Sequence, residues 1–229
     1  MIFSELESGS SLEGLPIQVY KTDIKAPKYL YLLGGVHGDE VEGVYVLKEL
    51  FTWLKMEHTL KDLPMIVVPI VNVDGYKNQT RVNAHLVDLN RNLPTKDWSA
   101  TFKEAKYNPG PKPLSEPENQ FLVKLFDKYK PGFIISFHTW KPILNFNGEC
   151  EDVARYLSEF NQYEIAGDIG YPTPGSLGSY AVEKYGSPVL TFECPELKKH
   201  RDSLKDIWKE NEEGLKKFFQ TDMIWEKLK

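Results

Sequence analysis

Residues 29–40 read YLYLLGGVHGDE, a short apolar run followed by a turn that carries a histidine and a glutamate. The run YLYLL has the length and composition of a buried strand. Residues 41–55 follow with apolar side chains at helical spacing, which predicts an amphipathic helix. His37 and Glu40 are therefore expected on a strand-to-helix loop, at the carboxyl end of a strand, where ligands bind in open α/β sheets.

The His-x-x-Glu spacing of His37 and Glu40 suits a metal site. Two residues three apart at the start of a helix can point the same way and hold one ion. Zinc accepts an imidazole nitrogen and a carboxylate, and a catalytic zinc commonly has three protein ligands and one open position. The alternative is a loop histidine beside a glutamate that favours the helix dipole. The rest of the chain has to decide between these interpretations.

Apolar runs and helical periodicity alternate along the chain. Strands are expected at 15–21 (an edge strand), 29–33, 65–71, 133–137 and 187–192, and helices at 41–55, 115–130, 151–160, 176–185 and 201–219. Ser115 is expected to cap the helix that begins there. The β-α-β order predicts parallel strands. We therefore expect one α/β domain, residues 1–229, with a mixed, mostly parallel central sheet flanked by helices and a loose leading segment at 1–14.

The bulk properties narrow the class of protein. The 229 residues carry a net charge of −5 with no long basic run, which argues against nucleic-acid binding. No apolar run approaches the length of a membrane span, and the first residues do not resemble a secretory signal. The two cysteines, Cys150 and Cys194, do not make a disulfide framework. We expect a cytoplasmic enzyme that contacts neither membrane nor nucleic acid.

Three predicted strands end in a candidate functional group: His37 with Glu40, then His138, then Glu193. A parallel sheet brings such strand ends to one edge. Two histidines and a glutamate form the ligand set of hydrolytic zinc enzymes, and a further glutamate can act as general base. Taken singly, His138 suits a capped strand end and Glu193 a surface salt bridge. Their joint placement favours a site.

The long irregular segment at 72–113 carries polar groups that suit a substrate with a free carboxylate. Loops of this length inside a compact domain are usually functional. Arginine matches a carboxylate with a planar pair of donors, so Asn90 and Arg91 are candidates for a carboxylate clamp. Arg81 is a candidate to support an oxyanion. The alternative is that these loop residues only satisfy backbone groups.

These motifs together resemble those of the zinc carboxypeptidase family, which includes carboxypeptidase A. The resemblance rests on His37-x-x-Glu40, NVDG at 72–75, TRVN at 80–83, VDLNRN at 87–92, His138 and TFE at 191–193. It runs from about residue 28 to 196. Within the family the chain most resembles the murein peptide amidases, through the stretches at 35–40, 88–98, 115–118 and 174–180. Those enzymes cut the bond between γ-D-glutamate and meso-diaminopimelate in peptides released from the cell wall.

The resemblance implies one bound Zn²⁺ and a role for each of several residues. It implies zinc ligands at His37, Glu40 and His138, a general base at Glu193, an oxyanion arginine at Arg81, a carboxylate clamp at Asn90 and Arg91, and a substrate-capping tyrosine at Tyr171. Tyr180 competes with Tyr171 for the last role, although its helical setting favours packing.

Some residues depart from the family pattern or lie outside it. Digestive carboxypeptidases have an arginine between the first histidine and glutamate, where this chain has Asp39, and the added carboxylate would favour a substrate amine. His85 is expected to be a loop residue rather than a ligand, and His58 and His200 are expected to be solvated. Cys194 is expected to be a small buried residue, because nothing nearby indicates a thiolate.

The resulting prediction is a zinc-dependent hydrolase that cleaves an amide bond next to a residue with a free carboxylate. Its expected partner is a small peptide, and the bond between γ-D-glutamate and meso-diaminopimelate is the expected target. The alternatives are a desuccinylase or aspartoacylase acting on N-acyl amino acids, which share a similar zinc site, and a general metallocarboxypeptidase. A zinc-free relative that only binds peptides is a further alternative of another class.

Overall fold

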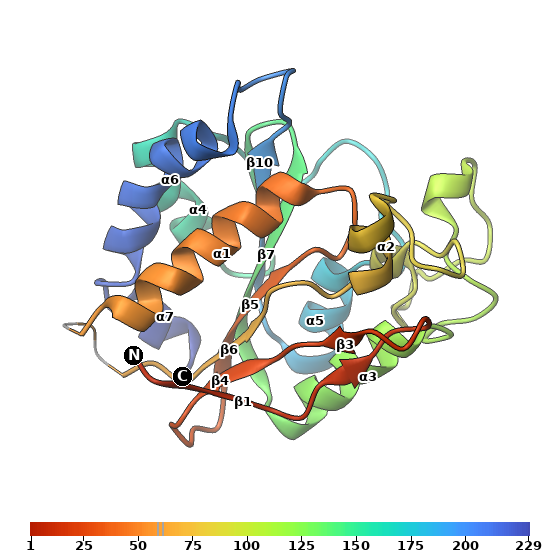
Figure 1. The fold of residues 1–229 in the computed structure, drawn as a ribbon, viewed down its shortest axis with the longest axis horizontal. Helices are drawn as coiled ribbons and strands as arrows, with labels where there is room; N and C mark the ends of the chain where they lie inside the picture. The colour runs from red at the N-terminus through yellow and green to blue at the C-terminus, as the bar shows by residue number, and fades with distance from the viewer. Residues whose placement is uncertain (59, 61) are drawn as a thin grey trace.

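A computed structural model describes residues 1–58, 60 and 62–229, and it contains an eight-stranded sheet as its central element (Figure 1). The order in the sheet is β1-β4-β6-β5-β7-β10-β8-β9. Its strands are β1 (Phe3–Glu5), β4 (Tyr20–Thr22), β5 (Tyr29–Gly34), β6 (Met65–Val68), β7 (Pro131–Trp140), β8 (Ile143–Asn147), β9 (Glu164–Ala166) and β10 (Val189–Pro195). A separate two-stranded sheet joins β2 (Gly9–Ser10) and β3 (Pro16–Ile17).

The helices are α1 (Val41–Met56), α2 (Val73–Asn78), α3 (Pro117–Lys128), α4 (Glu151–Asn161), α5 (Leu177–Tyr185), α6 (Leu204–Phe218) and α7 (Met223–Lys227), with short 3₁₀ turns at Leu89–Arg91 and Ala105–Tyr107. The prediction of a single α/β domain is confirmed. The centre of the sheet is parallel, because β5 pairs in parallel with β6 and β7, and β7 pairs in parallel with β10. Antiparallel pairs at β4–β6, β1–β4 and β8–β10 make the sheet mixed.

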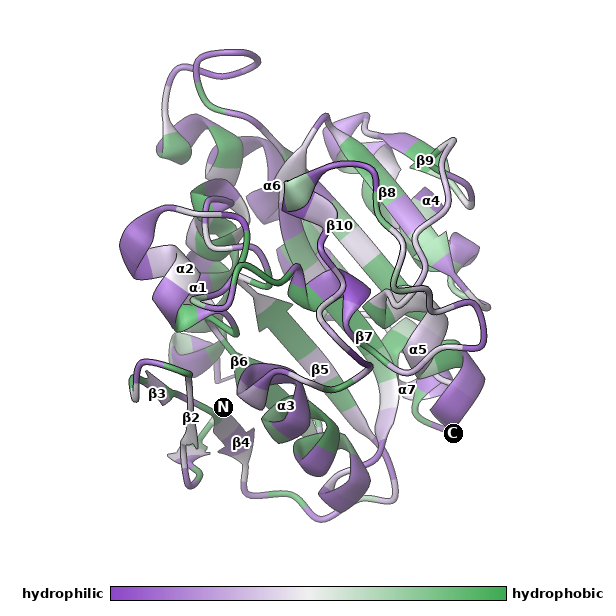
Figure 2. Ribbon diagram, turned by 90° about the vertical axis from the view of Figure 1, so that its right-hand side faces the viewer, coloured by the Kyte–Doolittle hydropathy of each residue, from purple (hydrophilic) through white to green (hydrophobic). Residues whose placement is uncertain are grey.

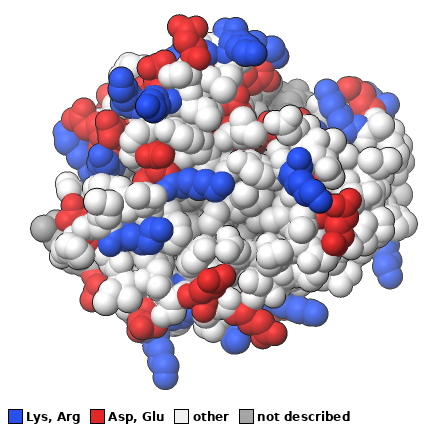
Figure 3. Space-filling model, viewed as in Figure 1, with Lys and Arg blue, Asp and Glu red and all other residues white. Residues whose placement is uncertain are grey.

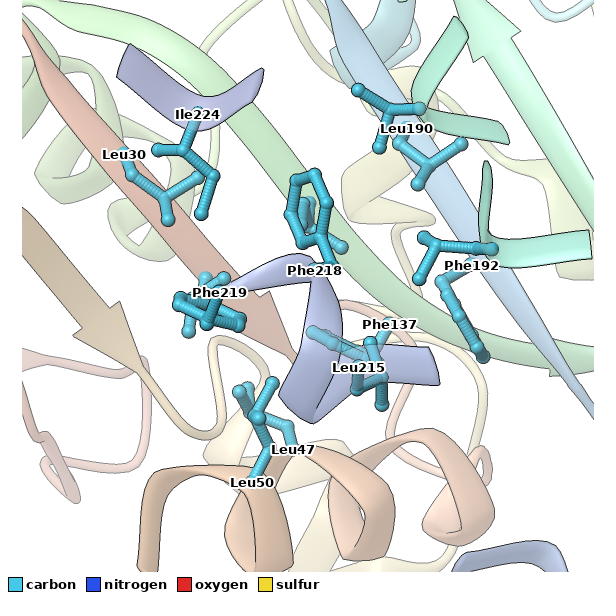
Figure 4. Close-up of a cluster of buried hydrophobic side chains, with 14 of the residues drawn as sticks. Leu30, Leu47, Leu50, Phe137, Leu190, Phe192, Leu215, Phe218, Phe219 and Ile224 are labelled. Atoms are coloured by element: carbon cyan, nitrogen blue, oxygen red, sulfur yellow. The ribbon is translucent and has the colours of Figure 1, made fainter. Parts of the chain in front are cut away.

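Alternation along the strands creates one apolar core on each face of the sheet. Leu30, Leu32 and Phe137 pack with α1, α4, α6 and α7. Figure 4 shows Phe218 of α6 inside this cluster, with side chains of the strands and α1 around it. Tyr31 and Leu33 point to the other face, where they pack with α3 and α5. Figure 1 shows α1 and α6 on one side of the central strands and α5 on the other, and Figure 2 shows the apolar strands behind α3 and α5. The central strands are therefore buried on both faces, as their continuous apolar runs indicate.

The first fourteen residues are not the loose segment that their polarity suggested. β1 pairs with β4 as the edge strand of the central sheet. The predicted edge strand at 15–21 is split between β3, which belongs to the two-stranded sheet, and β4, which lies one position in from the edge. The ammonium group of Met1 donates to the carbonyl oxygens of Leu54 and Glu57 at the end of α1. Ser11 donates to Asp74 at 2.6 Å. Local polarity gave no signal for these contacts, because the partners are distant in sequence.

The two strands that carry His138 and Glu193 extend further than predicted. β7 continues through His138 to Trp140, and β10 continues through Glu193 to Pro195, because these ends pair with each other in register. By contrast, β6 ends at Val68, three residues early. The strands β8 and β9 and the helix α7 were not predicted. They are short, and β8 is half polar, so they carry no clear periodicity.

The segment at 72–113 is more ordered than its sequence indicated. It begins with α2, whose N-cap Asn72 accepts a hydrogen bond from the backbone N–H of Gly75. The expected cap of α3 is also wrong: Glu116 holds the N-cap position without a side-chain cap, and Ser115 donates to Glu116 instead. The helices predicted at 41–55, 151–160, 176–185 and 201–219 are confirmed to within about three residues.

The face of the molecule seen in Figure 3 has no large patch of charge of one sign. Basic and acidic side chains are interspersed over the face that Figure 3 shows. No helix in the part of the chain that the structure describes has both the length and the apolarity required to cross a membrane.

Candidate active site

Three buried side chains converge on one point: His37 and Glu40 from the loop between β5 and α1, and His138 from β7. The two carboxylate oxygens of Glu40 lie 2.7 Å from His37 Nδ1 and 2.8 Å from His138 Nδ1. The two Nδ1 atoms are 3.3 Å apart. Among the described residues these three form the one group of histidine, cysteine or acidic side chains with the spacing of a metal site. The structure therefore brings together the three residues that the sequence predicted as metal ligands.

The outer nitrogens of both imidazoles are held by other side chains. His37 Nε2 lies 3.0 Å from Asp88 Oδ1, and His138 Nε2 lies 3.0 Å from Ser136 Oγ. A partner on the outer nitrogen fixes the orientation of a ligating imidazole and leaves the other nitrogen for a metal ion. Both Nδ1 atoms thus face the Glu40 carboxylate, and this donor set of two nitrogens and one carboxylate fits zinc with an open position.

Two glycines allow the backbone to approach closely at this site. A side chain on Gly38 would place its Cβ 2.0 Å from the carbonyl carbon of Gly75, and one on Gly43 would place its Cβ 2.8 Å from the carbonyl oxygen of His138. The first contact lets the loop carrying His37 pack on α2. The second lets α1 pack on β7, which brings Glu40 next to His138.

Charge balance in the three-residue group follows from its burial. Burial raises the pKa of Glu40, but the two imidazoles outweigh this effect and hold the pKa well below its usual range. Burial lowers the pKa of His37, but Glu40 and Asp88 outweigh it and raise the pKa to about 9. Burial lowers the pKa of His138. The Glu40 carboxylate is therefore charged in the fold, and it is the anionic member of this donor set.

Glu193 lies beside this group on the neighbouring strand. Its register partner across the parallel β7–β10 pair is His138, so both side chains emerge on the same face. Glu193 Oε2 is buried and has no hydrogen-bond partner among the described residues. Burial and the negative charge of Glu40 raise the pKa of Glu193 to about 8. An unpaired buried carboxylate is costly, and such groups are typical of functional sites.

Arg81 bridges the metal-site carboxylate and Asp88. Its Nη2 donates to Asp88 Oδ2 at 3.0 Å, and its Nη1 donates to Glu40 Oε1 at 3.3 Å. The guanidinium also lies over the ring of Tyr107, with 5.4 Å between its Cζ and the ring centroid. These contacts hold Arg81 at the wall of the cavity, with its guanidinium beside the predicted zinc ligands.

Asn90 and Arg91 lie at the amino-terminal end of α5. Asn90 Oδ1 accepts from the backbone N–H of Leu177 at 2.8 Å, and Arg91 Nη1 donates to the carbonyl oxygen of Asn90 at 2.7 Å. Arg91 Cζ lies 5.6 Å from the centroid of Tyr107. Burial lowers the pKa of Arg91 from its high ordinary value. The two arginines therefore present positive charge to the same side of the cavity.

All the predicted site residues line one cavity of about 610 Å³. Tyr171 lies on its wall, half-exposed, and its ring packs edge-on against Trp140 with 6.2 Å between centroids. Tyr180 does not line the cavity and is buried in the core formed with α3 and α5. The structure thus brings Tyr171 to the site and places Tyr180 in a packing role.

The remaining predictions about single residues also agree with the structure. His85 is half-exposed and lies 2.9 Å from Glu116, away from the metal group. His58 and His200 are exposed. Cys194 is buried, and burial raises the pKa of its thiol well above the ordinary value.

Sequence reasoning missed the supporting residues Asp88, Ser136 and Tyr107. Asp88 stands inside the quoted motif at 87–92, but its contacts with His37 and Arg81 depend on the fold. Ser136 precedes His138 by two residues, so period-two alternation places both on one face, and this signal was available. Nothing in the sequence near Tyr107 indicates that it packs under two arginines.

The comparison with protein families decides the identity of this site. A family model described as zinc carboxypeptidase matches residues 2–151, well over half of the chain, and the match includes His37, Glu40 and His138. The chain belongs to the zinc carboxypeptidase family. This zinc carboxypeptidase is therefore a hydrolase of peptide or amide bonds, and the group of His37, Glu40 and His138 matches the site for its one Zn²⁺.

Named relatives of this zinc carboxypeptidase include two bacterial murein peptide amidases. Murein peptide amidase A of Vibrio campbellii is 29% identical over 201 residues, which cover 82% of this chain and 78% of the relative. Murein peptide amidase A of Escherichia coli is 29% identical over 215 residues, which cover 87% of this chain and 85% of the relative.

Solved structures agree with the fold of the zinc carboxypeptidase. The crystal structure of murein-tripeptide amidase from Escherichia coli O157 superposes with a TM-score of 0.76 at 27% identity, covering 95% of this chain and 92% of that one. Carboxypeptidase A from Helicoverpa armigera superposes with a TM-score of 0.79 at 18% identity, covering 94% of this chain and 67% of that one. The second likeness shows the shared fold alone.

Proposed function

We propose that this zinc carboxypeptidase cleaves the amide bond that precedes a residue with a free carboxylate, and that its substrate is the γ-D-glutamyl-meso-diaminopimelate bond of cell-wall peptides. One observation carries the proposal. The three metal-ligand residues line one cavity together with Glu193, whose Oε2 is buried without a partner among the described residues, and with Arg81 and Arg91. Within reach of one small peptide, this arrangement offers a general base, a metal site that would polarise the scissile carbonyl, and arginines that would bind the substrate's free carboxylate.

Asn90 and Arg91 would hold the free carboxylate of the residue that leaves. The Arg91 guanidinium is planar and carries donors in a fork that matches a carboxylate. Its Nη1 is held by the carbonyl of Asn90. Asn90 in turn is fixed by Leu177, so the clamp is pre-organised on α5. Tyr171 stands at the edge of the same cavity, where it would cover the bound residue.

Glu193 would act as the general base and then as the general acid. Its Oε2 takes a proton from the water whose oxygen attacks the scissile carbonyl carbon, and it gives the proton to the amine as the carbon–nitrogen bond breaks. The raised pKa suits both transfers, because the group exchanges its proton near neutral pH. His37, Glu40 and His138 would hold zinc, which would polarise the scissile carbonyl and lower the pKa of the attacking water.

Arg81 would stabilise the negative charge that develops on the carbonyl oxygen. Its Nη1 already reaches the Glu40 carboxylate, so the guanidinium lies at the edge of the metal site. Asp88 holds the other side of the guanidinium through two hydrogen bonds. A donor fixed in this way costs no reorganisation when the charge develops.

The choice of a cell-wall peptide rests on the relatives. Two proteins named murein peptide amidase A match more than four fifths of this chain at 29% identity. The crystal structure of a murein-tripeptide amidase covers 95% of it. These likenesses cover most of the chain rather than the metal motif alone, and they favour wall peptides over N-acyl amino acids as the substrate.

The proposal is tested with Glu193→Gln, a substitution that keeps the size of the side chain and removes its basicity. We expect the variant to bind zinc like the parent and to lose turnover by about 10²–10⁴-fold. Bound zinc is measured by elemental analysis, and turnover is measured as release of diaminopimelate from L-Ala-γ-D-Glu-meso-diaminopimelate. Glu213→Gln, on the exposed side of α6, is the matched control. Turnover close to that of the parent would remove Glu193 from the role.

A further inference from the structure

One aromatic ring supports both arginines of the cavity. The Cζ atoms of Arg81 and Arg91 lie 5.4 Å and 5.6 Å from the centroid of the Tyr107 ring. Both distances fall within the range of about 6 Å over which the face of a ring attracts a guanidinium group. Arg81, Arg91 and Tyr107 all line the cavity. The two arginines therefore share one support, although they serve different parts of the proposed substrate.

Hydrogen bonds restrain the two arginines unequally. Nε and Nη2 of Arg81 donate to the Asp88 carboxylate, and its Nη1 donates to Glu40. In the described part of the chain, the side chain of Arg91 makes one hydrogen bond, from Nη1 to the carbonyl oxygen of its neighbour Asn90. The contact with Tyr107 therefore gives Arg91 a restraint from a distant segment that its hydrogen bonding does not supply.

A ring suits this support better than a second carboxylate would. The two guanidinium groups are close enough to repel each other: burial lowers the pKa of Arg91, and the charge of Arg81 lowers it further, against the opposite effect of Asp88. A carboxylate beside Arg91 would occupy the N–H donors that the substrate needs. The negative face of a ring attracts both cations and leaves those donors free.

Backbone hydrogen bonding ties the segment of Tyr107 to the segment that carries the arginine partners. Tyr107 ends a short 3₁₀ turn, and the carbonyl oxygen of the next residue, Asn108, accepts from the backbone N–H of Asp88 at 2.8 Å. Lys106 also lies near the ring, with 4.9 Å between its Nζ and the centroid, but this lysine is exposed and pairs with Glu104 at 3.2 Å. The ring therefore has a defined place beside the two arginines.

We infer that Tyr107 is a positioning residue whose ring holds the guanidinium groups of Arg81 and Arg91 in place, so that the oxyanion and the free carboxylate of one substrate are bound together. The inference rests on the proposed function, which assigns these two roles to the arginines. Without the ring, Arg81 keeps its hydrogen bonds to Asp88 and Glu40, whereas Arg91 gains freedom to turn. The loss therefore falls mainly on the binding of the carboxylate, which is present in substrate and transition state alike.

The test compares Tyr107→Leu and Tyr107→Phe in the zinc-loaded protein with L-Ala-γ-D-Glu-meso-diaminopimelate as the substrate. The leucine variant is expected to raise KM by at least about tenfold and to keep kcat within about threefold, and the phenylalanine variant to keep both values near those of the parent. Tyr76→Leu is the matched control, because Tyr76 also lies under a cation, Lys48 at 5.2 Å, but outside the cavity. An unchanged KM in Tyr107→Leu, or an equal loss in Tyr107→Phe, would overturn the inference.

A measurement of side-chain order decides the inference apart from turnover. Nuclear magnetic resonance gives an order parameter for the Nε–H group of each arginine. The value for Arg91 is expected to fall below about 0.6 in Tyr107→Leu and to stay high in Tyr107→Phe and Tyr76→Leu, with a smaller fall for Arg81. An unchanged value for Arg91 in the leucine variant would overturn the inference while leaving the hydrolase function in place. If no peptide is cleaved but Arg91 loses order in that variant, the proposed substrate fails and the support of Arg91 by Tyr107 stands.

Discussion

Asp88→Asn tests whether one buried carboxylate organises both the metal site and Arg81. Asp88 is fully buried, and it accepts from four groups: His37 Nε2, the backbone N–H of Asn90, and Nε and Nη2 of Arg81. Asparagine has nearly the same shape but only one accepting oxygen and no charge. The variant therefore keeps the contacts of one oxygen and places an NH₂ group opposite either the imidazole or the guanidinium.

The expected size of the effect follows from these contacts. Losing an outer-shell partner of a ligating histidine weakens metal binding by about 10–100-fold, or about 1.4–2.7 kcal/mol. Arg81 loses its charged partner Asp88 and keeps only the contact with Glu40, which adds a loss of up to about 3 kcal/mol in the free energy of unfolding of the zinc-free protein. Burial raises the pKa of Asp88, but His37, Arg81 and Arg91 outweigh this effect and hold the pKa well below its usual range, so the group is charged in the fold.

Zinc affinity is measured by competition with a chromophoric chelator, and stability is measured by urea unfolding of the zinc-free protein. Asp202→Asn is the control, because Asp202 is an exposed aspartate before α6. Unchanged zinc affinity and stability in Asp88→Asn, relative to this control, would refute the idea that Asp88 orients His37 and restrains Arg81.

Three further predictions follow from the same contacts. The pKa of Glu193 is about 8 in the folded zinc-free protein against an ordinary 4.5, so between these values the folded protein holds a proton that the unfolded chain has released. The free energy of unfolding should therefore fall as the pH rises from about 5 to 8. Thermal melts of Glu193→Gln should show a smaller fall over the same pH range, because glutamine does not titrate. Gly38→Ala should lower the free energy of unfolding by about 2–4 kcal/mol and weaken zinc binding, because its Cβ meets the Gly75 backbone; urea unfolding at wild-type stability would contradict the close approach. His85→Ala should keep full zinc content and turnover and lose less than about 1 kcal/mol, because His85 pairs with Glu116 while half-exposed; loss of zinc would show that it supports the site after all.

The central sheet could be predicted because its strands are buried on both faces. Runs such as residues 29–33 and 133–137 are apolar throughout, and a buried run of that length has few other structures to adopt. The metal ligands could be predicted because parallel strands place their carboxyl ends at one edge. The order of the chain therefore carries the positions of His37, His138 and Glu193 almost directly.

The parts that escaped prediction depend on contacts between distant segments. β8 alternates apolar residues with Asn145 and Asn147, which are as typical of loops as of strands, and only pairing with β10 makes it a strand. The edge strand β1 exists because β4 offers it a free edge. Asp88 lies 51 residues from His37 in the chain, and its role appears only when the fold brings the two within 3.0 Å.

The most direct test of the central claim is the release of diaminopimelate from L-Ala-γ-D-Glu-meso-diaminopimelate by the zinc-loaded protein. The account predicts release that a chelator abolishes and added zinc restores, and no release by Glu193→Gln with its zinc in place. Intact peptide after incubation with protein shown to hold one zinc per chain would contradict the proposed substrate. Release that persists in the chelated protein would contradict the role of the metal site itself.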